Sequence, residues 1–219
     1  MELRENRDRL VEAMLPHAAF DGWSAVSMEA AARDLGLSPR EVARLFPHGP
    51  IDAVAHFVAL ADRRMAEDFA ARPRGNRVGD RVFAAIQARL DRWAAHREAI
   101  RRALALLALP AHLPLAGKLA WDTADAIWRT VGDHDKGAAR LTKRASLAAI
   151  QSSTLLFWLD DDSENAIETW SFLRRRLDEI QALPRLRQTV GRKADGALGG
   201  LLGRLRPARR HWAVTRRAR

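Results

Sequence analysis

Apolar residues recur at every third or fourth position along most of this chain, which is the spacing of amphipathic α-helices. The repeats predict seven helices, at about residues 10–18, 50–72, 78–93, 100–107, 120–131, 141–159 and 167–180. No segment alternates with period two for long enough to indicate a sheet. The predicted fold class is therefore all-α.

Two more short helices are expected between the first repeat and the long helix at residue 50. Ser27 is placed to cap the first of them, and Gly36 suits the left-handed position that ends it. Ser38 and Glu41 form a capping box for the second, with Pro39 at its first helical position. Two short helices after a longer one are typical of a helix-turn-helix.

At the N-terminus of an all-helical chain, this arrangement resembles that of the TetR regulators. It predicts a TetR-like helical bundle, in which residues 1–49 form a three-helix head and residues 50–182 a larger helical ligand domain. A DNA-binding regulator with a hydrophobic effector is accordingly an alternative function. Over residues 24–50, however, three arginines and three acids cancel, and Glu41 stands near the start of the would-be recognition helix. We therefore expect no DNA binding.

The positive charge of the chain is concentrated at its C-terminus. Residues 185–219 contain eleven Arg or Lys and one acidic residue, so their net charge is +10. This equals the formal net charge of the whole chain. The preceding residues are electrically neutral. A neutral body with a cationic tail at residues 183–219 predicts attachment to an anionic surface.

The tail also has an amphipathic pattern. Four leucines lie at helical spacing on one face, with basic residues and a tryptophan nearby: Leu198, Leu201, Leu202, Leu205, Arg204, Arg206 and Trp212. An apolar face with basic flanks is typical of a helix that lies in a membrane interface. We expect these residues to bind an anionic membrane surface. A disordered basic tail, or one attracted to RNA, remains an alternative.

Catalytic and metal-binding patterns are missing from the sequence. There is no cysteine, the seven histidines are scattered, and no nucleophile elbow, phosphate loop or dinucleotide fingerprint is present. Asp52 and His56 share a helix face and are interpreted as a surface pair. We expect no enzyme activity, no metal and no cofactor. The excess of Arg over Lys suggests a bacterial origin.

Several runs together resemble one family, the Coq-nine accessory proteins of ubiquinone biosynthesis. They keep their order and spacing over residues 8–181. The runs are Ala19-Phe-Asp-Gly-Trp23, Leu35-Gly-Leu-Ser38, Phe46-Pro-His-Gly49 with Asp52, Arg101-Arg-Ala-Leu-Ala-Leu-Leu-Ala-Leu-Pro110, Trp121-Asp-Thr-Ala-Asp-Ala-Ile-Trp128 with Gly132-Asp133, Thr142-Lys-Arg-Ala145 and Thr169-Trp-Ser-Phe-Leu173.

The resemblance implies a non-catalytic homodimer that holds an isoprenoid quinone or another lipid in its helical domain. It also implies a cytoplasmic protein, peripheral on the inner membrane face, that presents quinone intermediates to the di-iron demethoxyubiquinone hydroxylase. Seven large apolar residues are candidates to line the cavity: Leu104, Leu107, Trp121, Ile127, Trp128, Leu155 and Trp158. Each could equally be an ordinary core residue.

One stretch departs from the family. Where the family has Asp-Phe-Asn-Trp-Tyr, an aromatic patch used for lipid and hydroxylase contact, this chain has Gly137-Ala-Ala-Arg140-Leu141. The patch is therefore not carried over, and a divergent member with another partner or lipid is an alternative.

Overall fold

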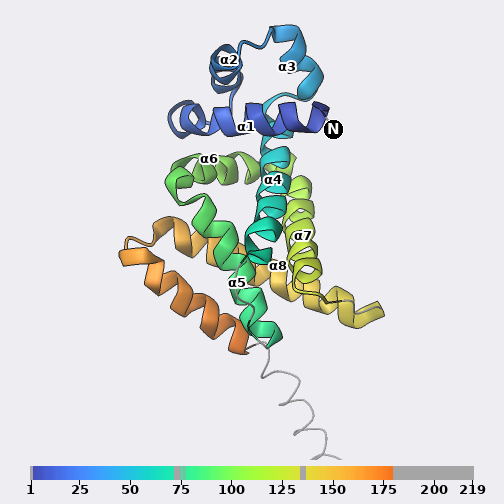
Figure 1. The fold of residues 1–219 in the computed structure, drawn as a ribbon, viewed down its shortest axis with the longest axis vertical. Coiled ribbons are helices and arrows are strands. Elements are labelled where there is room, and N and C mark those ends of the chain that lie inside the picture. The colour runs from blue at the N-terminus through green and yellow to red at the C-terminus, as the bar shows by residue number, and fades with distance from the viewer. Residues whose placement is uncertain (1, 72–74, 76, 134–136, 180–219) are drawn as a thin grey trace, which may run out of the picture. The chain divides into compact units, whose positions relative to one another are not determined.

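The computed structural model describes residues 2–71, 75, 77–133 and 137–179 (Figure 1). Its elements are α1 (Glu2–Asp21), α2 (Ala25–Asp34), α3 (Pro39–Leu45), α4 (Pro50–Ala70), α5 (Val78–Arg92), α6 (Arg97–Leu107), α7 (Leu113–Thr130), α8 (Gly137–Asp160) and a last helix over residues 167–179. These described residues contain no strand. The all-α prediction is confirmed.

The chain divides into two units, Met1–Asp178 and Glu179–Arg219. The fold described below is that of the first unit. The tail prediction for residues 183–219, with its seven named membrane-binding residues, lies outside the described residues. It stays a prediction.

The caps of the head are those of a helix-turn-helix, with one correction. Ser24, not Ser27, is the N-cap of α2, and Ser27 completes the capping box from the third helical position. The second box is as predicted: the Ser38 side chain accepts from the Glu41 backbone N–H, and Glu41 accepts from the Ser38 N–H. Gly36 has φ +67°, the left-handed conformation that favours glycine.

The first helix joins the head to the body. Its buried face is almost completely closed to solvent, with each of Leu10, Val11, Met14, Leu15 and Ala18 at most 1% exposed. α1 packs against α2 and also against α4 and α6 of the body (Figure 1). The Trp23 indole adds a buried hydrogen bond of 2.8 Å to the Ala99 carbonyl on α6.

The body is built around α4, which packs against α5 and α7, while α7 packs against α8 (Figure 1). α8 turns at residues 161–166 into the last helix. The buried Asp161 carboxylate organises this turn, because it accepts hydrogen bonds from the N–H and hydroxyl groups of both Ser163 and Thr169. Burial alone would raise the pKa of Asp161, but these four donors outweigh it and hold the pKa well below its usual range.

In the described part of the chain, no single helix is long and apolar enough to cross a bilayer. The segments Ala94–Leu107 and Pro110–Thr130 together have the length and apolar composition of a span, but they are bent by 90°.

Candidate ligand pocket in the helical body

Three of the seven predicted cavity residues line one apolar pocket. Leu104 and Leu107 reach it from α6, and Leu155 reaches it from α8. The remaining wall comes from α4, α5, the residue after α5, and α6: Phe57, Val58, Ala61, Arg89, Leu90, Trp93, Ile100 and Ala103. Residues separated by almost one hundred positions in the sequence therefore form one surface.

The other four predicted residues do not line this pocket. Ile127 is fully buried in α7. Trp121 and Trp128 are half-buried, and the Trp128 indole donates to the Lys143 carbonyl at 3.2 Å. Trp158 is 1% exposed, beneath the Arg97 guanidinium, which lies 4.4 Å from its ring centre.

The pocket is small in this structure. Its volume is about 40 Å³, which is room for a few water molecules and not for an acyl or prenyl chain. An acyl or prenyl chain enters only if part of the wall moves. Leu104 and Leu155, which are half-buried, belong to the less tightly enclosed part of that wall.

A buried ion pair stands behind the α5 wall. Arg89 Nε donates to Asp62 Oδ1 at 2.8 Å, and the Thr123 hydroxyl donates to Asp62 Oδ2 at 2.9 Å. All three residues are at most 9% exposed. Both carboxylate oxygens accept hydrogen bonds, and the guanidinium charge is balanced by the carboxylate. The Asp62–Arg89 pair therefore has no net charge.

Trp93, directly after α5, is different. Its side chain is 6% exposed, and its Nε1 is buried without a hydrogen-bond partner among the described residues. Its ring meets Phe57 edge-on, with ring centres 5.1 Å apart. A buried N–H without an acceptor costs about 1–3 kcal/mol, so this donor carries an uncompensated cost in the structure.

Arg89 and Trp93 were not among the predicted site residues. A signal was nevertheless present in the sequence: Ile86, Arg89, Leu90 and Trp93 share one stripe of an amphipathic helix. A charged residue inside an apolar stripe marks a buried polar group. The sequence could not show that one of its neighbours would be left without a partner.

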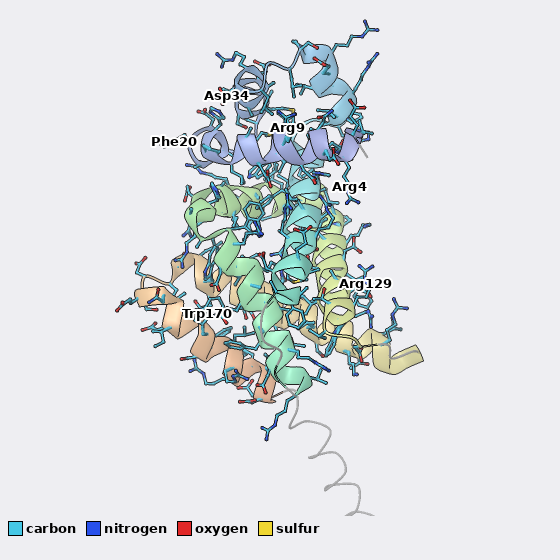
Figure 2. The ribbon with its side chains drawn as sticks, viewed as in Figure 1. Arg4, Arg9, Phe20, Asp34, Arg129 and Trp170 are labelled. Atoms are coloured by element: carbon cyan, nitrogen blue, oxygen red, sulfur yellow. The ribbon has the colours of Figure 1, made fainter. Side chains whose placement is uncertain are left out.

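Larger depressions lie elsewhere on this unit, and they are open and lined in part by charged or polar side chains. One of about 580 Å³ lies between α4 and α7 and includes Arg129, which Figure 2 labels. Others of about 500 and 440 Å³ lie beside the Asp161 turn and include Trp170, which Figure 2 also labels. None of these is an enclosed apolar cavity, so none suits a long apolar ligand. In the described part of the chain, no group of three or more His, Asp or Glu residues could hold a metal ion.

Comparison with known proteins identifies relatives of this chain. A family model described as COQ9 matches residues 113–184. The chain is 30% identical over 191 residues to the mitochondrial ubiquinone biosynthesis protein COQ9 of Drosophila melanogaster, covering 84% of this chain and 58% of the relative. It is 28% identical to the Xenopus tropicalis protein, covering 90% and 64%, and 27% identical to the Homo sapiens protein, covering 89% and 64%.

The chain is similar to COQ9 proteins over most of its length. The resemblance predicted from the sequence is thus confirmed. The chain spans about 58–64% of the length of these three relatives. All three are named mitochondrial proteins, so the comparison lends no support to the bacterial origin suggested by composition.

A solved structure confirms the fold prediction. The TetR transcriptional regulator from Nitrosomonas europaea superposes with a TM-score of 0.63 and 23% identity, covering 80% of this chain and 97% of the regulator. At this identity the likeness concerns the fold alone. The chain therefore has a TetR-like helical bundle.

Proposed function

We propose that this chain is a non-catalytic accessory protein of ubiquinone biosynthesis that binds an isoprenoid or another lipid. One observation carries the proposal: proteins named for ubiquinone biosynthesis match 84–90% of the chain, far beyond a single motif. The apolar pocket supports the lipid-binding part. Three predicted residues meet there, and its walls are mostly aliphatic or aromatic.

Ligand entry requires a larger pocket than the one of about 40 Å³ in this structure. We place the movement at α6 and α8, which supply the half-buried Leu104 and Leu155. In the proposed cycle these two helices separate around an apolar chain and close again when it leaves. The buried faces beneath α1 stay in place, because they are packed without exposure.

Membrane attachment, dimerisation and a hydroxylase partner complete the proposal. Attachment is assigned to the amphipathic pattern of Leu198, Leu201, Leu202 and Leu205 with its basic flanks. At the site of the family's aromatic patch, Arg140 and Leu141 are exposed on α8, and Arg140 pairs with Asp125. Co-purification with the di-iron hydroxylase, and the mass of the assembly in solution, test the two protein contacts.

We further propose that the helix-turn-helix of this chain does not bind DNA. Glu41 in the first turn of α3 is exposed, and its negative charge would repel an approaching phosphate. Hydrogen bonds from Ser38 lower the pKa of Glu41 and keep this charge negative. A gel shift with duplex DNA tests the alternative, since a regulator would show sequence-specific, salt-sensitive binding.

The decisive experiment is to delete the gene in the organism that carries it and to complement the deletion strain. We expect ubiquinone to fall and a pathway precursor to accumulate. The wild-type chain should restore ubiquinone, whereas Leu107→Trp, which overfills the pocket, should not. Glu29→Gln, on the exposed surface of the head, is the matched control and should restore it. Normal ubiquinone in the deletion strain would contradict the proposal.

A further inference from the structure

We propose that the apolar pocket selects ligands that carry a neutral carbonyl oxygen, which accepts a hydrogen bond from Trp93 Nε1. The ligand class is an apolar chain ending in a carbonyl-bearing head, such as a quinone ring. The inference deepens the proposed function and rests on its claim that this pocket receives an apolar ligand.

The first argument is the state of Trp93 itself. Its indole lines the pocket, is 6% exposed, and has no acceptor for Nε1 in the described structure. Buried indole N–H groups usually have a partner, as Trp23 does at the Ala99 carbonyl. An orphan donor at an apolar pocket is explained if the ligand supplies its acceptor.

The second argument is that the pocket side chains offer donors and no acceptor. Among the lining side chains, Arg89 and Trp93 are polar, and both groups only donate. A carbonyl oxygen accepts hydrogen bonds but has no hydrogen to donate, so it brings no donor that would need an acceptor in the pocket. A water or a hydroxyl brings hydrogens that would find no acceptor there.

The third argument explains why the pocket should prefer a neutral carbonyl over a negatively charged carboxylate. Arg89 already faces Asp62 at 2.8 Å, and Thr123 holds the second oxygen of the same carboxylate. The pocket therefore has no uncompensated positive charge. A fatty-acid carboxylate would lose its hydration without gaining a counter-ion, which is costly.

The test measures the preference of the full-length protein among three probes with one decyl chain. The probes are a trimethylbenzoquinone, the matching ring hydrocarbon without oxygen, and decanoate. Equilibrium dialysis gives their dissociation constants. We expect wild-type protein to prefer the quinone over the hydrocarbon about three- to tenfold, the range of one neutral hydrogen bond, and to bind decanoate more weakly than the quinone.

Trp93→Phe keeps an aromatic ring and removes the donor. We expect it to bring the quinone preference to within about twofold, while hydrocarbon binding is retained. Trp170→Phe is the matched control, because its indole already donates to Asn165 outside this pocket, and it should keep the wild-type preference. The infrared carbonyl stretch of bound quinone should lie lower in wild type and Trp170→Phe than in Trp93→Phe.

The possible failures are distinguishable. Equal binding of quinone and hydrocarbon by wild type, an unchanged preference in Trp93→Phe, or tighter binding of decanoate overturns this inference and leaves the proposed function standing. Binding of none of the three probes overturns both. If Trp93→Phe does not fold, an unshifted carbonyl stretch in the wild-type complex is sufficient to reject the inference.

Discussion

The interior beneath α1 and the pocket beside α6 are both apolar, but they differ in how tightly they are packed. Beneath α1, five side chains are at most 1% exposed. Beside α6, Leu104 and Leu155 are half-buried around about 40 Å³ of space, next to an indole without an acceptor. The face beneath α1 is filled by side chains of the protein itself. The pocket, in contrast, contains empty space and an indole N–H that has no hydrogen-bond acceptor among the described residues. This difference separates structural core from candidate site.

The largest effect should come from the buried ion pair of Asp62 and Arg89, behind the pocket wall. Asp62→Ala leaves the Arg89 guanidinium buried without its counter-charge, so we expect a loss of about 3–5 kcal/mol in the free energy of unfolding. Denaturant titration measures it. The double variant Asp62→Leu/Arg89→Met removes both charges and should recover most of the loss. If Asp62→Ala were as stable as the wild-type protein, the ion pair would not be buried as described.

The closed core can be tested by truncation. Leu15→Ala removes three buried carbons from a face with no room to spare, and we expect a loss of about 3 kcal/mol in unfolding free energy. Exposed Leu3, on the same helix, is the control, and Leu3→Ala should change stability by less than about 0.5 kcal/mol. Equal losses in the two variants would refute the contrast between the faces of α1.

The contact between α1 and α4 should depend on pH. Burial lowers the pKa of His56 below its ordinary value of 6.5, although its 2.5 Å hydrogen bond to Asp8 acts in the opposite direction. The folded state therefore binds fewer protons than the unfolded chain, and stability should be full above about pH 6.5 and fall as the pH drops below it. Unfolding titrations from pH 7.5 to 5 measure the slope.

His56→Gln should reduce that slope, whereas the exposed His48→Gln should not. The Asp8 carboxylate contributes in a lower window. Burial alone would raise its pKa, but hydrogen bonds from His56 and Arg63 lower it, so its contribution is lost in acid below its ordinary value of 3.8. A pH-independent stability of the wild-type protein between pH 7.5 and 5 would contradict this account.

The smallest effect should come from the pocket wall. Leu104→Ala removes a half-buried side chain beside existing space, so the loss in unfolding free energy should be about 1 kcal/mol, well below that of Leu15→Ala. Binding of a bulky apolar probe should be unchanged or tighter, because the pocket becomes larger. If Leu104→Ala were as destabilising as Leu15→Ala, the wall beside α6 would be ordinary core.

Much of the fold could be predicted because helices and their caps are local. The three- and four-residue repeats located the helices, and Ser38 with Glu41 marked the start of α3. Ser24 was missed as the cap of α2, since Ser27 three residues later offers the same chemistry. The four-residue spacing of Asp52 and His56 predicts a surface pair, and this prediction is wrong. His56 contacts Asp8 instead, while Asp52 accepts from the His48 backbone N–H.

The sequence by itself determined the all-α class, the capped helices and the family resemblance, because each depends on residues near one another or on an ordered series of runs. Only the tertiary structure decided that Leu104, Leu107 and Leu155 meet while Ile127 and Trp158 do not. It also decided that Arg89 is neutralised and Trp93 is left without an acceptor. These outcomes depend on how helices cross, and a repeat along one helix gives the face that is buried but not the residues that lie opposite it.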